Sequence, residues 1–324
     1  MKKLLKILGG LLALVIVAAA AGYFWAGSKA KSLMSRTMSA HTVDFPIPFP
    51  LDDSVVKRLK LTPDSAAKLA LSHAAERGKH LVESRYACIE CHGANFGGGT
   101  MIDAAIIGRF LGPNITLGAG SRTTNYKAVD WDHIVRHGIK AGGNPGSMPS
   151  QDFVEMSDQE LSDIVAYIRT QPNVDSTVPP VTLGPLGKFL VATGKMQLAA
   201  DVITDHNVTH TTLPPAAVAS VEFGKHVAMV CSGCHQASFA GGPIVGADPS
   251  WPPAKNLTSH PDALGKWTLE QFKATLRTAK RPDGTDLKPP MSGLAPYANK
   301  MKDVEIEALW MYLQSLPQVA PVGT

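Results

Sequence analysis

C-I-E-C-H at Cys88–His92 and C-S-G-C-H at Cys231–His235 are the two stretches that decide the fold of this 324-residue chain. In each, the two cysteines lie three residues apart, so on a helical turn both sulfur atoms project from one face. A histidine follows the second cysteine directly. All four cysteines of the chain lie in these two motifs, so none is left for a disulfide.

The pattern C-x-x-C-H is typical of covalent haem c attachment, in which both cysteines form thioethers and the histidine lies beneath the iron as its proximal ligand. A zinc site or a redox dithiol is the open alternative, because two C-x-x-C pairs together offer four thiolates. The histidine after each pair favours haem. We therefore expect two covalently bound haem c groups, held by Cys88, Cys91, His92, Cys231, Cys234 and His235.

A longer repeat surrounds both motifs, with its landmarks mostly about 143 residues apart. The landmarks that recur in the same order are G-K-H before each motif, F-G-G-G or F-A-G-G after it, P-N-I-T or K-N-L-T, a tryptophan, a methionine beside proline, and an amphipathic last helix. Such a series predicts two homologous, mostly helical domains. The last helices are expected at 156–170, with Ser157 as N-cap and Glu160 as its capping-box partner, and at 304–316.

The repeat also indicates the sixth iron ligand of each haem. Met148 lies 56 residues after His92, and Met291 lies 56 residues after His235. Both methionines lie in Gly/Pro-rich segments rather than on an apolar helix face. We predict Met148 and Met291 as axial ligands, against the alternatives that each only fills a gap in the core or that His137 ligates the first iron.

The remaining candidates carry weaker signals. His80 and His226 align in the repeat, and helix packing or a hydrogen bond to backbone explains them adequately. Arg136 and Arg277 align roughly, as partners of haem propionates or as members of a solvated face. The other histidines have no repeat partner and receive no role; they are His41, His73, His133, His206, His210 and His260.

The N-terminus predicts export. Residues 7–25 are apolar without a charge, and Lys2, Lys3 and Lys6 precede them. This length favours a retained transmembrane anchor with a cytoplasmic N-terminus over a cleaved signal peptide. The three lysines supply most of the formal net charge of +4, so that charge does not indicate a nucleic-acid partner.

Proline-marked stretches divide the rest of the chain. Pro46, Pro48 and Pro50 predict an extended backbone that leads away from the membrane. The expected organisation is a membrane anchor or signal at 1–30, a Pro-rich spacer at 31–65, domains at 66–172 and 216–324, and a connector at 173–215. Because the connector exceeds forty residues, we expect it to pack across one or both domains.

With these residues assembled, the chain resembles the class I c-type cytochrome domain twice over, at 66–172 and 216–317. It is similar to dihaem cytochromes that serve membrane-bound dehydrogenases or terminal oxidases as electron carriers. The resemblance implies an all-α fold around each haem, with histidine and methionine as axial ligands. The second domain departs from the first at Lys255, where the first has Pro113, and at Gln236, where the first has Gly93.

A six-coordinate iron offers no open position to a substrate, so the expected chemistry is one-electron transfer. The competing hypotheses are a dihaem cytochrome c peroxidase-like enzyme and a thiosulfate-oxidising enzyme. The expected partners are redox proteins, such as a dehydrogenase, an oxidase, a photosynthetic complex or a small cytochrome, and the membrane. The expected location is a bacterial inner membrane, with the haem domains in the periplasm.

Overall fold

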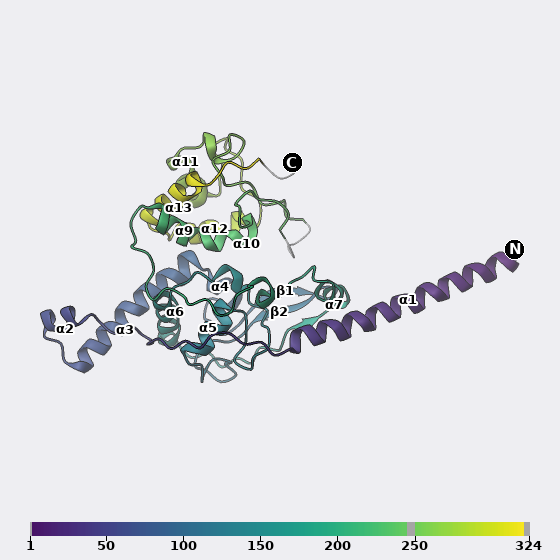
Figure 1. The fold of residues 1–324 in the computed structure, drawn as a ribbon, viewed down its shortest axis with the longest axis horizontal. Helices are drawn as coiled ribbons and strands as arrows, with labels where there is room; N and C mark the ends of the chain where they lie inside the picture. The colour runs from purple at the N-terminus through teal and green to yellow at the C-terminus, as the bar shows by residue number, and fades with distance from the viewer. Residues whose placement is uncertain (1, 245–249, 321–324) are drawn as a thin grey trace.

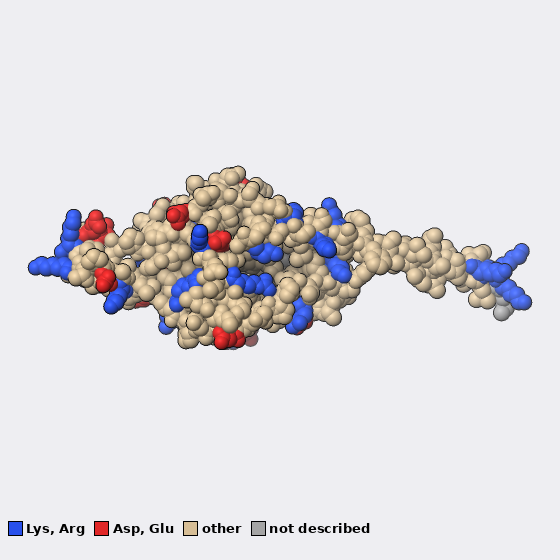
Figure 2. Space-filling model, turned by 90° about the horizontal axis from the view of Figure 1, so that it is seen from below, with Lys and Arg blue, Asp and Glu red and all other residues tan. Residues whose placement is uncertain are grey.

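A long N-terminal helix projects from two helical domains in the computed structural model, which describes residues 2–244 and 250–320 (Figure 1). The end of the second predicted domain, residues 321–324, lies outside the described residues. The helix α1 (Lys2–Ser35) contains an 18-residue window of mean hydropathy 2.5 that is not buried by the rest of the chain. Figure 2 shows basic side chains at its free end, separated from the body by an uncharged stretch. It continues beyond the expected boundary at residue 30, because Ala26 and Ala30 are buried where it meets the body.

The helices and strands follow the predicted repeat. The first domain and the segment before it contain α2 (Asp53–Leu59), α3 (Pro63–His80), the π-helical turn η1 (Leu81–Arg85), α4 (Cys88–His92), β1 (Gly99–Ala104), β2 (Gly108–Gly112), α5 (Ala128–Arg136), η2 (Ser150–Asp152) and α6 (Asp158–Thr170). The connector contains β3 (Thr182–Leu183), α7 (Pro185–Ala192) and α8 (Ala199–Val202). The second domain contains α9 (Val221–Ala228), η3 (Met229–Cys231), α10 (Ser232–His235), η4 (Leu264–Lys266), α11 (Leu269–Thr278), α12 (Met291–Ala298) and α13 (Asp303–Ser315).

Each domain is built on a close crossing of its first and last helices, α3 with α6 and α9 with α13. Gly78 and Gly224, the glycines of the two G-K-H landmarks, lie at these crossings. A Cβ on Gly78 would overlap the carbonyl oxygen of Asp163, and one on Gly224 would overlap that of Ala308. The landmark is therefore explained by packing, because only glycine lets the two backbones approach this closely.

The terminal helices also carry the expected aromatic packing. The ring of Tyr167 meets Phe96 edge-to-face at 6.0 Å, and Tyr312 meets Phe239 in the same way at 5.7 Å. The predicted cap of α6 is present, since the Glu160 N–H donates to the Ser157 hydroxyl and the Ser157 N–H donates to the Glu160 carboxylate. Each domain has its own hydrophobic core built around this helix pair.

The fold is mostly helical, as expected, but the described residues also form a three-stranded antiparallel sheet that the sequence did not predict, in the order β1-β2-β3. The hairpin β1–β2 follows the first C-x-x-C-H motif, and β3 comes from the connector. A Cβ on Gly112 in β2 would overlap the carbonyl oxygen of Cys91. The strands therefore lie directly against the back of the first motif.

The structure of residues 31–65 differs from the extended spacer that the sequence predicts. Its first residues belong to α1, and residues 53–59 form α2 although the prolines indicated an extended chain. The extended part does not stand free, because Phe45 is buried in the core of the first domain and the Ser162 hydroxyl donates to the Pro46 carbonyl oxygen at 2.7 Å. Alternating apolar side chains around the prolines make this segment part of the first domain.

The connector packs on the first domain, in keeping with its length. The backbone N–H groups of Asp158 and Gln159, at the start of α6, donate to the carbonyl oxygens of Thr211 and Thr212 at 2.9 and 3.0 Å. These bonds satisfy donors that a helix start leaves unpaired. The connector thus finishes the N-terminus of the last helix of the first domain.

Replacing Gly224 with alanine tests the helix crossing. We expect Gly224→Ala to lower the free energy of unfolding by about 1–3 kcal/mol, because the added methyl group overlaps α13. Gly142→Ala is the matched control, since a Cβ there meets only ordinary contacts. Chemical denaturation followed by circular dichroism measures both. A Gly224→Ala protein as stable as the control would contradict the crossing.

Candidate functional site

The two C-x-x-C-H motifs fold as predicted, each on a short helical turn. The first forms α4, and the second spans the end of η3 and α10. Burial raises the pKa of Cys88 and of Cys231 to about 12, so neither thiol is a ready thiolate for metal binding or redox exchange. No cysteine joins a group of three or more metal-binding side chains within residues 2–244 and 250–320. The four-cysteine zinc site is therefore not formed.

The histidines of both motifs are oriented by the same kind of hydrogen bond. The Nδ1 atom of His92 donates to the carbonyl oxygen of Pro113 at 3.0 Å, and that of His235 donates to Lys255 at 2.6 Å. A carbonyl can only accept, so Nδ1 holds the proton and Nε2 keeps its lone pair for a metal. Burial also lowers the pKa of both rings. The exchange of Pro113 for Lys255 is harmless because only the backbone carbonyl is used.

The loop that presents this carbonyl is built identically in both domains. The side-chain oxygen of Asn114 accepts the backbone N–H two residues on at 3.0 Å, and that of Asn256 does the same at 2.8 Å. Their side-chain NH₂ groups donate to Val174 and Val319, beyond the last helix of each domain, at 2.7 and 2.6 Å. The asparagine of the P-N-I-T and K-N-L-T landmarks therefore ties the loop that orients the motif histidine to the end of the domain.

The other departure between the repeats leaves the backbone unchanged. Gly93 has φ 78° and ψ 158°, and Gln236 has φ 65° and ψ 164°. This region suits glycine and costs another residue on the order of 1–3 kcal/mol. The second domain keeps the conformation despite that cost, so the chain turns away from the proximal histidine in the same way in both halves.

The two predicted axial methionines lie in different local structures. Met148 lies in a bend, half-buried against the core of the first domain. The Ser150 N–H donates to the Met148 carbonyl oxygen at 2.8 Å, and the Ser150 hydroxyl donates to Ile134 at 2.8 Å, which holds the bend on α5. Met291 is the first residue of α12 rather than a loop residue. Their role as ligands stays a prediction.

The two aligned histidines, His80 and His226, connect the domains instead of bonding to backbone. The Nε2 atom of His80 donates to Glu305 of the second domain at 2.9 Å, and that of His226 donates to Glu160 of the first domain at 2.9 Å. The two bonds are related by the repeat, since each joins the G-K-H histidine of one domain to the capping glutamate of the other. The domains thus dock with an approximate two-fold symmetry.

Arg85 lies at the centre of this interface, with a side chain only 7% exposed. Its guanidinium forms ion pairs with Glu160 at 3.0 Å and with Glu305 at 3.1 Å. Burial alone would raise the pKa of Glu160, but the hydrogen bond from His226 and the charge of Arg85 lower it to about 2. We call Arg85, Glu160, Glu305, His80 and His226 the interdomain network.

Both haem-binding motifs lie at the same interface (Figure 1). Asp152, four residues after Met148, packs so closely on Gly233 of the second motif that a Cβ there would overlap its carboxylate. In the opposite sense, the hydroxyl of Tyr297, six residues after Met291, donates to Glu90 of the first motif. Burial raises the pKa of Asp152 to about 7. Each motif therefore faces the segment after the predicted methionine ligand of the other domain.

The aligned arginines form ion pairs within the first and second domains, and the burial of Arg136 shows that the hypothesis of a solvated face is wrong for this residue. Arg136 is fully buried and pairs with Asp158 at the start of α6 at 2.8 Å. Arg277 pairs with Asp303 at the start of α13 at 2.5 Å. Both arginines fix the helix before the methionine segment to the last helix. His137 does not face a haem motif, because its two ring nitrogens meet His206 and His210.

Sequence reasoning missed the interdomain network. It found Glu160 only as a helix cap, and it found His80 and His226 only as members of a landmark. The signal that could have revealed it is the histidine of the G-K-H landmark, a polar residue that recurs in both domains outside the haem motifs. Arg85 has no counterpart in the second domain, where Ala228 stands at the aligned position, so the repeat could not reveal it.

Comparisons with known proteins identify relatives of this chain. A family model described as Cytochrome c matches residues 75–172 and 221–317, together more than half of the chain. The chain is 26% identical to the fructose dehydrogenase cytochrome subunit of Gluconobacter japonicus over 286 residues, which cover 81% of this chain and 56% of that subunit. It is 24% identical to the cytochrome c subunit of alcohol dehydrogenase (quinone) of Gluconacetobacter polyoxogenes over 308 residues, 82% of this chain and 64% of that subunit.

A shorter match covers part of the chain. Cytochrome c4 of Thiocapsa roseopersicina is 30% identical over 163 residues, 50% of this chain and 62% of that protein. The chain therefore spans between 56% and 64% of the length of these three relatives.

The lowered pKa of Glu160 predicts a pH dependence of the interdomain network. A carboxyl with a pKa near 2 when folded and about 4.3 when unfolded stabilises the fold above pH of about 4.3, and this contribution is lost as the pH falls toward 2. We expect Glu160→Gln, which keeps the helix cap, to cost about 1–3 kcal/mol at pH 7 and much less near pH 2.5. Denaturant unfolding at both pH values measures this difference.

Glu307→Gln is the control, because this carboxylate pairs with Lys273 on the outer side of α13 and is 35% exposed. Its expected cost is at most about 0.5 kcal/mol at either pH. A loss for Glu160→Gln that is equal at both pH values would contradict the assigned charge interaction.

Proposed function

The chain belongs to the cytochrome c family, and on that basis we propose that it transfers electrons one at a time through two His/Met-ligated haems as the cytochrome subunit of a membrane-bound dehydrogenase. Haem c supplies one-electron exchange between ferric and ferrous iron when it is bound. The chain's own residues hold it: the paired cysteines attach it, His92 and His235 offer Nε2, and Met148 and Met291 complete the two sets of ligands.

The reciprocal interface is the observation that carries the relay. Each haem-binding motif contacts the segment after the methionine of the other domain, through Asp152 with Gly233 and Tyr297 with Glu90. The interdomain network fixes this orientation with buried, closely spaced charges of opposite sign. A docking that holds both motifs at one interface favours electron exchange within the molecule over two independent carriers.

The relatives indicate the kind of partner. Two of them are cytochrome subunits of fructose dehydrogenase and of alcohol dehydrogenase (quinone), by their names. Both matches cover more than four fifths of this chain. We therefore propose a membrane-associated dehydrogenase as the electron donor, and a second redox partner in the membrane or periplasm as the acceptor.

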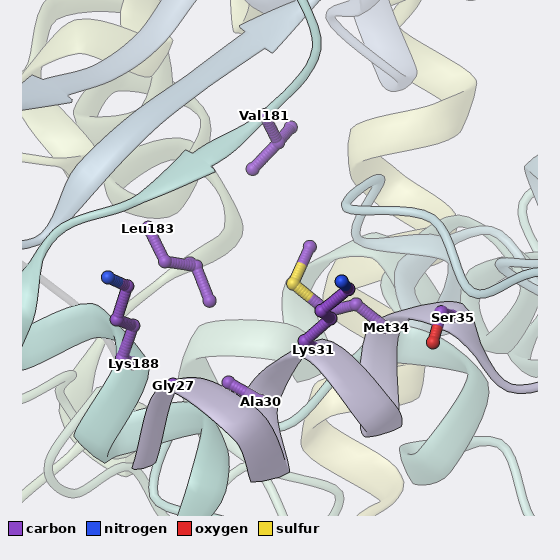
Figure 3. Close-up of a pocket in the computed structure, with 8 residues that line it drawn as sticks. All are labelled: Gly27, Ala30, Lys31, Met34, Ser35, Val181, Leu183 and Lys188. Carbon is purple, nitrogen blue, oxygen red and sulfur yellow. The ribbon is translucent and has the colours of Figure 1, made fainter. Parts of the chain in front are cut away.

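The way in which α1 meets the first domain supports a retained anchor. Lys188 on α7 donates to the Tyr23 hydroxyl at 2.8 Å, and its ammonium lies 4.5 Å from the centre of that ring. Beside Lys188, residues of α1, β3 and α7 line an open pocket of about 280 Å³, in which Lys31 and Met34 of α1 lie across from Leu183 (Figure 3). These contacts between α1 and the first domain would serve no purpose if α1 were a signal peptide that is removed.

The same helix α7 carries exposed apolar side chains beside the base of α1. Leu186 is 39% exposed and Phe189 is 50% exposed. At the point where a transmembrane helix enters the body, such residues fit the interfacial region of a bilayer. We propose that α7 rests on the periplasmic face of the membrane and holds the first domain close to it.

The methionine ligands are tested spectroscopically. We expect Met148→Ala and Met291→Ala each to remove half of the methionine–iron charge-transfer absorption of the oxidised protein, and the double variant to remove all of it. Met156→Ala is the control, because this methionine is buried in the core of the first domain. Unchanged spectra in both single variants, or peroxide turnover by the half-reduced wild-type protein, would contradict two closed electron-transfer haems.

The anchor and the partner are tested on native membranes. We expect the full-length chain to remain in the pellet after an alkaline carbonate wash, with its N-terminal lysines detectable by mass spectrometry. Mild detergent should then release it together with the catalytic subunit of a dehydrogenase. A mature chain that begins after residue 25 and appears in the soluble fraction would refute the anchor, and release without any dehydrogenase would refute the partner.

A further inference from the structure

Outside the haem-binding motifs, three histidine rings and a carboxylate converge in the first domain. Asp132 and His137 come from α5 and the residue after it, His41 comes from the segment after α1, and His210 comes from the connector. One ligand atom of each lies within 4.8 Å of the others. None of these residues contributes to electron transfer as proposed above.

The cluster is enclosed and has the dimensions of a metal site. The side chains of Asp132 and His137 are fully buried, and those of His210 and His41 are 4% and 12% exposed. The Nε2 atoms of His41 and His137 both lie 3.6 Å from Oδ2 of Asp132, and Nε2 of His210 lies 3.2 Å from Nε2 of His137. Tetrahedral zinc with bonds of about 2.0–2.1 Å separates its ligands by about 3.3 Å.

The hydrogen bonds behind two of the rings fix their tautomers. Nδ1 of His41 lies 3.2 Å from the carbonyl oxygen of His206, so it carries the proton and Nε2 carries a lone pair. Nε2 of His206 donates to the carbonyl of Ala200 at 3.0 Å, which leaves its Nδ1 as an acceptor. That atom lies 3.2 Å from Nδ1 of His137, which must therefore donate. Nε2 of His137 is then a lone pair as well.

The third ring follows the same rule. The backbone of Val154 accepts a hydrogen bond from the His210 ring. Because Nε2 of His210 faces His137, its Nδ1 is the donor and its Nε2 is the third lone pair. Metal-binding histidines typically donate their other N–H to such outer partners. With these tautomers, the Nε2 lone pairs of the three rings point at one another.

The carboxylate completes this set. Oδ1 of Asp132 accepts from Nε of Arg136 at 2.7 Å, whereas Oδ2, which faces the rings, accepts no hydrogen bond from any described residue. Arg136 also pairs with Asp158, so its one positive charge is shared by two carboxylates. Oδ2 of this buried carboxylate therefore stays available at the point where the ring nitrogens meet.

We propose that Nε2 of His41, His137 and His210 and Oδ2 of Asp132 bind a divalent transition-metal ion, Zn²⁺, in a closed tetrahedral site. Three imidazoles and a carboxylate are ligands that zinc accepts, and four protein ligands without an open position indicate a structural role. The ion ties the segment after α1 and the connector to α5. The second domain has no equivalent, since Lys273 and Thr278 align with Asp132 and His137.

Metal analysis of the haem-loaded, untagged full-length chain in detergent tests the site. The protein is stripped with a chelator, incubated with ZnCl₂ and dialysed against metal-free buffer. We expect one zinc for every two haem irons. His137→Ala and Asp132→Asn should lower the retained zinc at least tenfold, and His260→Ala, in the second domain and outside the cluster, should not change it. Equal retention in all four proteins would overturn the proposal.

X-ray absorption at the zinc edge supplies a readout that a merely structural role would not move. We expect a first shell of nitrogen and oxygen at about 2.0–2.1 Å without sulfur. Unchanged haem absorption in the variants would show that they fold. If the variants do not fold, the wild-type protein still tests the site. Failure to retain zinc would show that the cluster is only a set of hydrogen-bonded histidines, and a shell of sulfur ligands would place the ion elsewhere. Either result refutes the site.

Discussion

Arg85 lies between two buried carboxylates, Glu160 of the first domain and Glu305 of the second, and the rest of the dihaem arrangement depends on this contact. Charges removed from water are tolerated only when they are closely paired, because an unpaired partner costs several kcal/mol. Each carboxylate also accepts a hydrogen bond from a histidine of the opposite domain. Rotation or sliding of one domain on the other would break several of these contacts together, so the interface has one favoured orientation.

That orientation gives the haem-binding motifs their relation to each other. The two glutamates cap α6 and α13, which are the helices that cross α3 and α9. The π-helical turn η1 leads from α3 into the first motif. Val230, in η3 beside the second motif, packs against the core of the first domain. The contact that pairs the charges thus also brings both motifs to one interface. Membership of the cytochrome c family accounts for the haem in each domain. The interdomain network of this chain determines how its two cytochrome c domains face each other.

Much of this architecture could be predicted from the sequence, because the repeat records local requirements. A glycine at each helix crossing, an asparagine behind each motif histidine and the cap at Ser157 all recur or follow known patterns. What failed depended on contacts between distant segments. The partners of His80 and His226 lie in the other domain, and no local pattern states how two domains dock. The prolines near Phe45 correctly indicated an extended chain. This segment is buried because apolar side chains alternate along it, which the prolines alone do not reveal.

The parts outside the repeat collect on the first domain. The segment after α1 and the connector both pack there, and His41 and His210 meet α5 from these two segments. The second domain is held by the interdomain network and by the chain that links it, and it lies on the side of the first domain away from the base of α1 (Figure 1). The molecule is thus divided into a first domain that carries α1 and is fixed by its added segments, and a second domain fixed by paired charges.

The central claim, that the docked domains form one relay, is tested most directly by electron exchange in the half-reduced protein. A rapid one-electron pulse, followed by haem absorption over a range of protein concentrations, measures how the electron redistributes between the two haems. We expect a redistribution rate that does not depend on protein concentration. A rate that rises in proportion to concentration would show exchange only between molecules, and would contradict the relay.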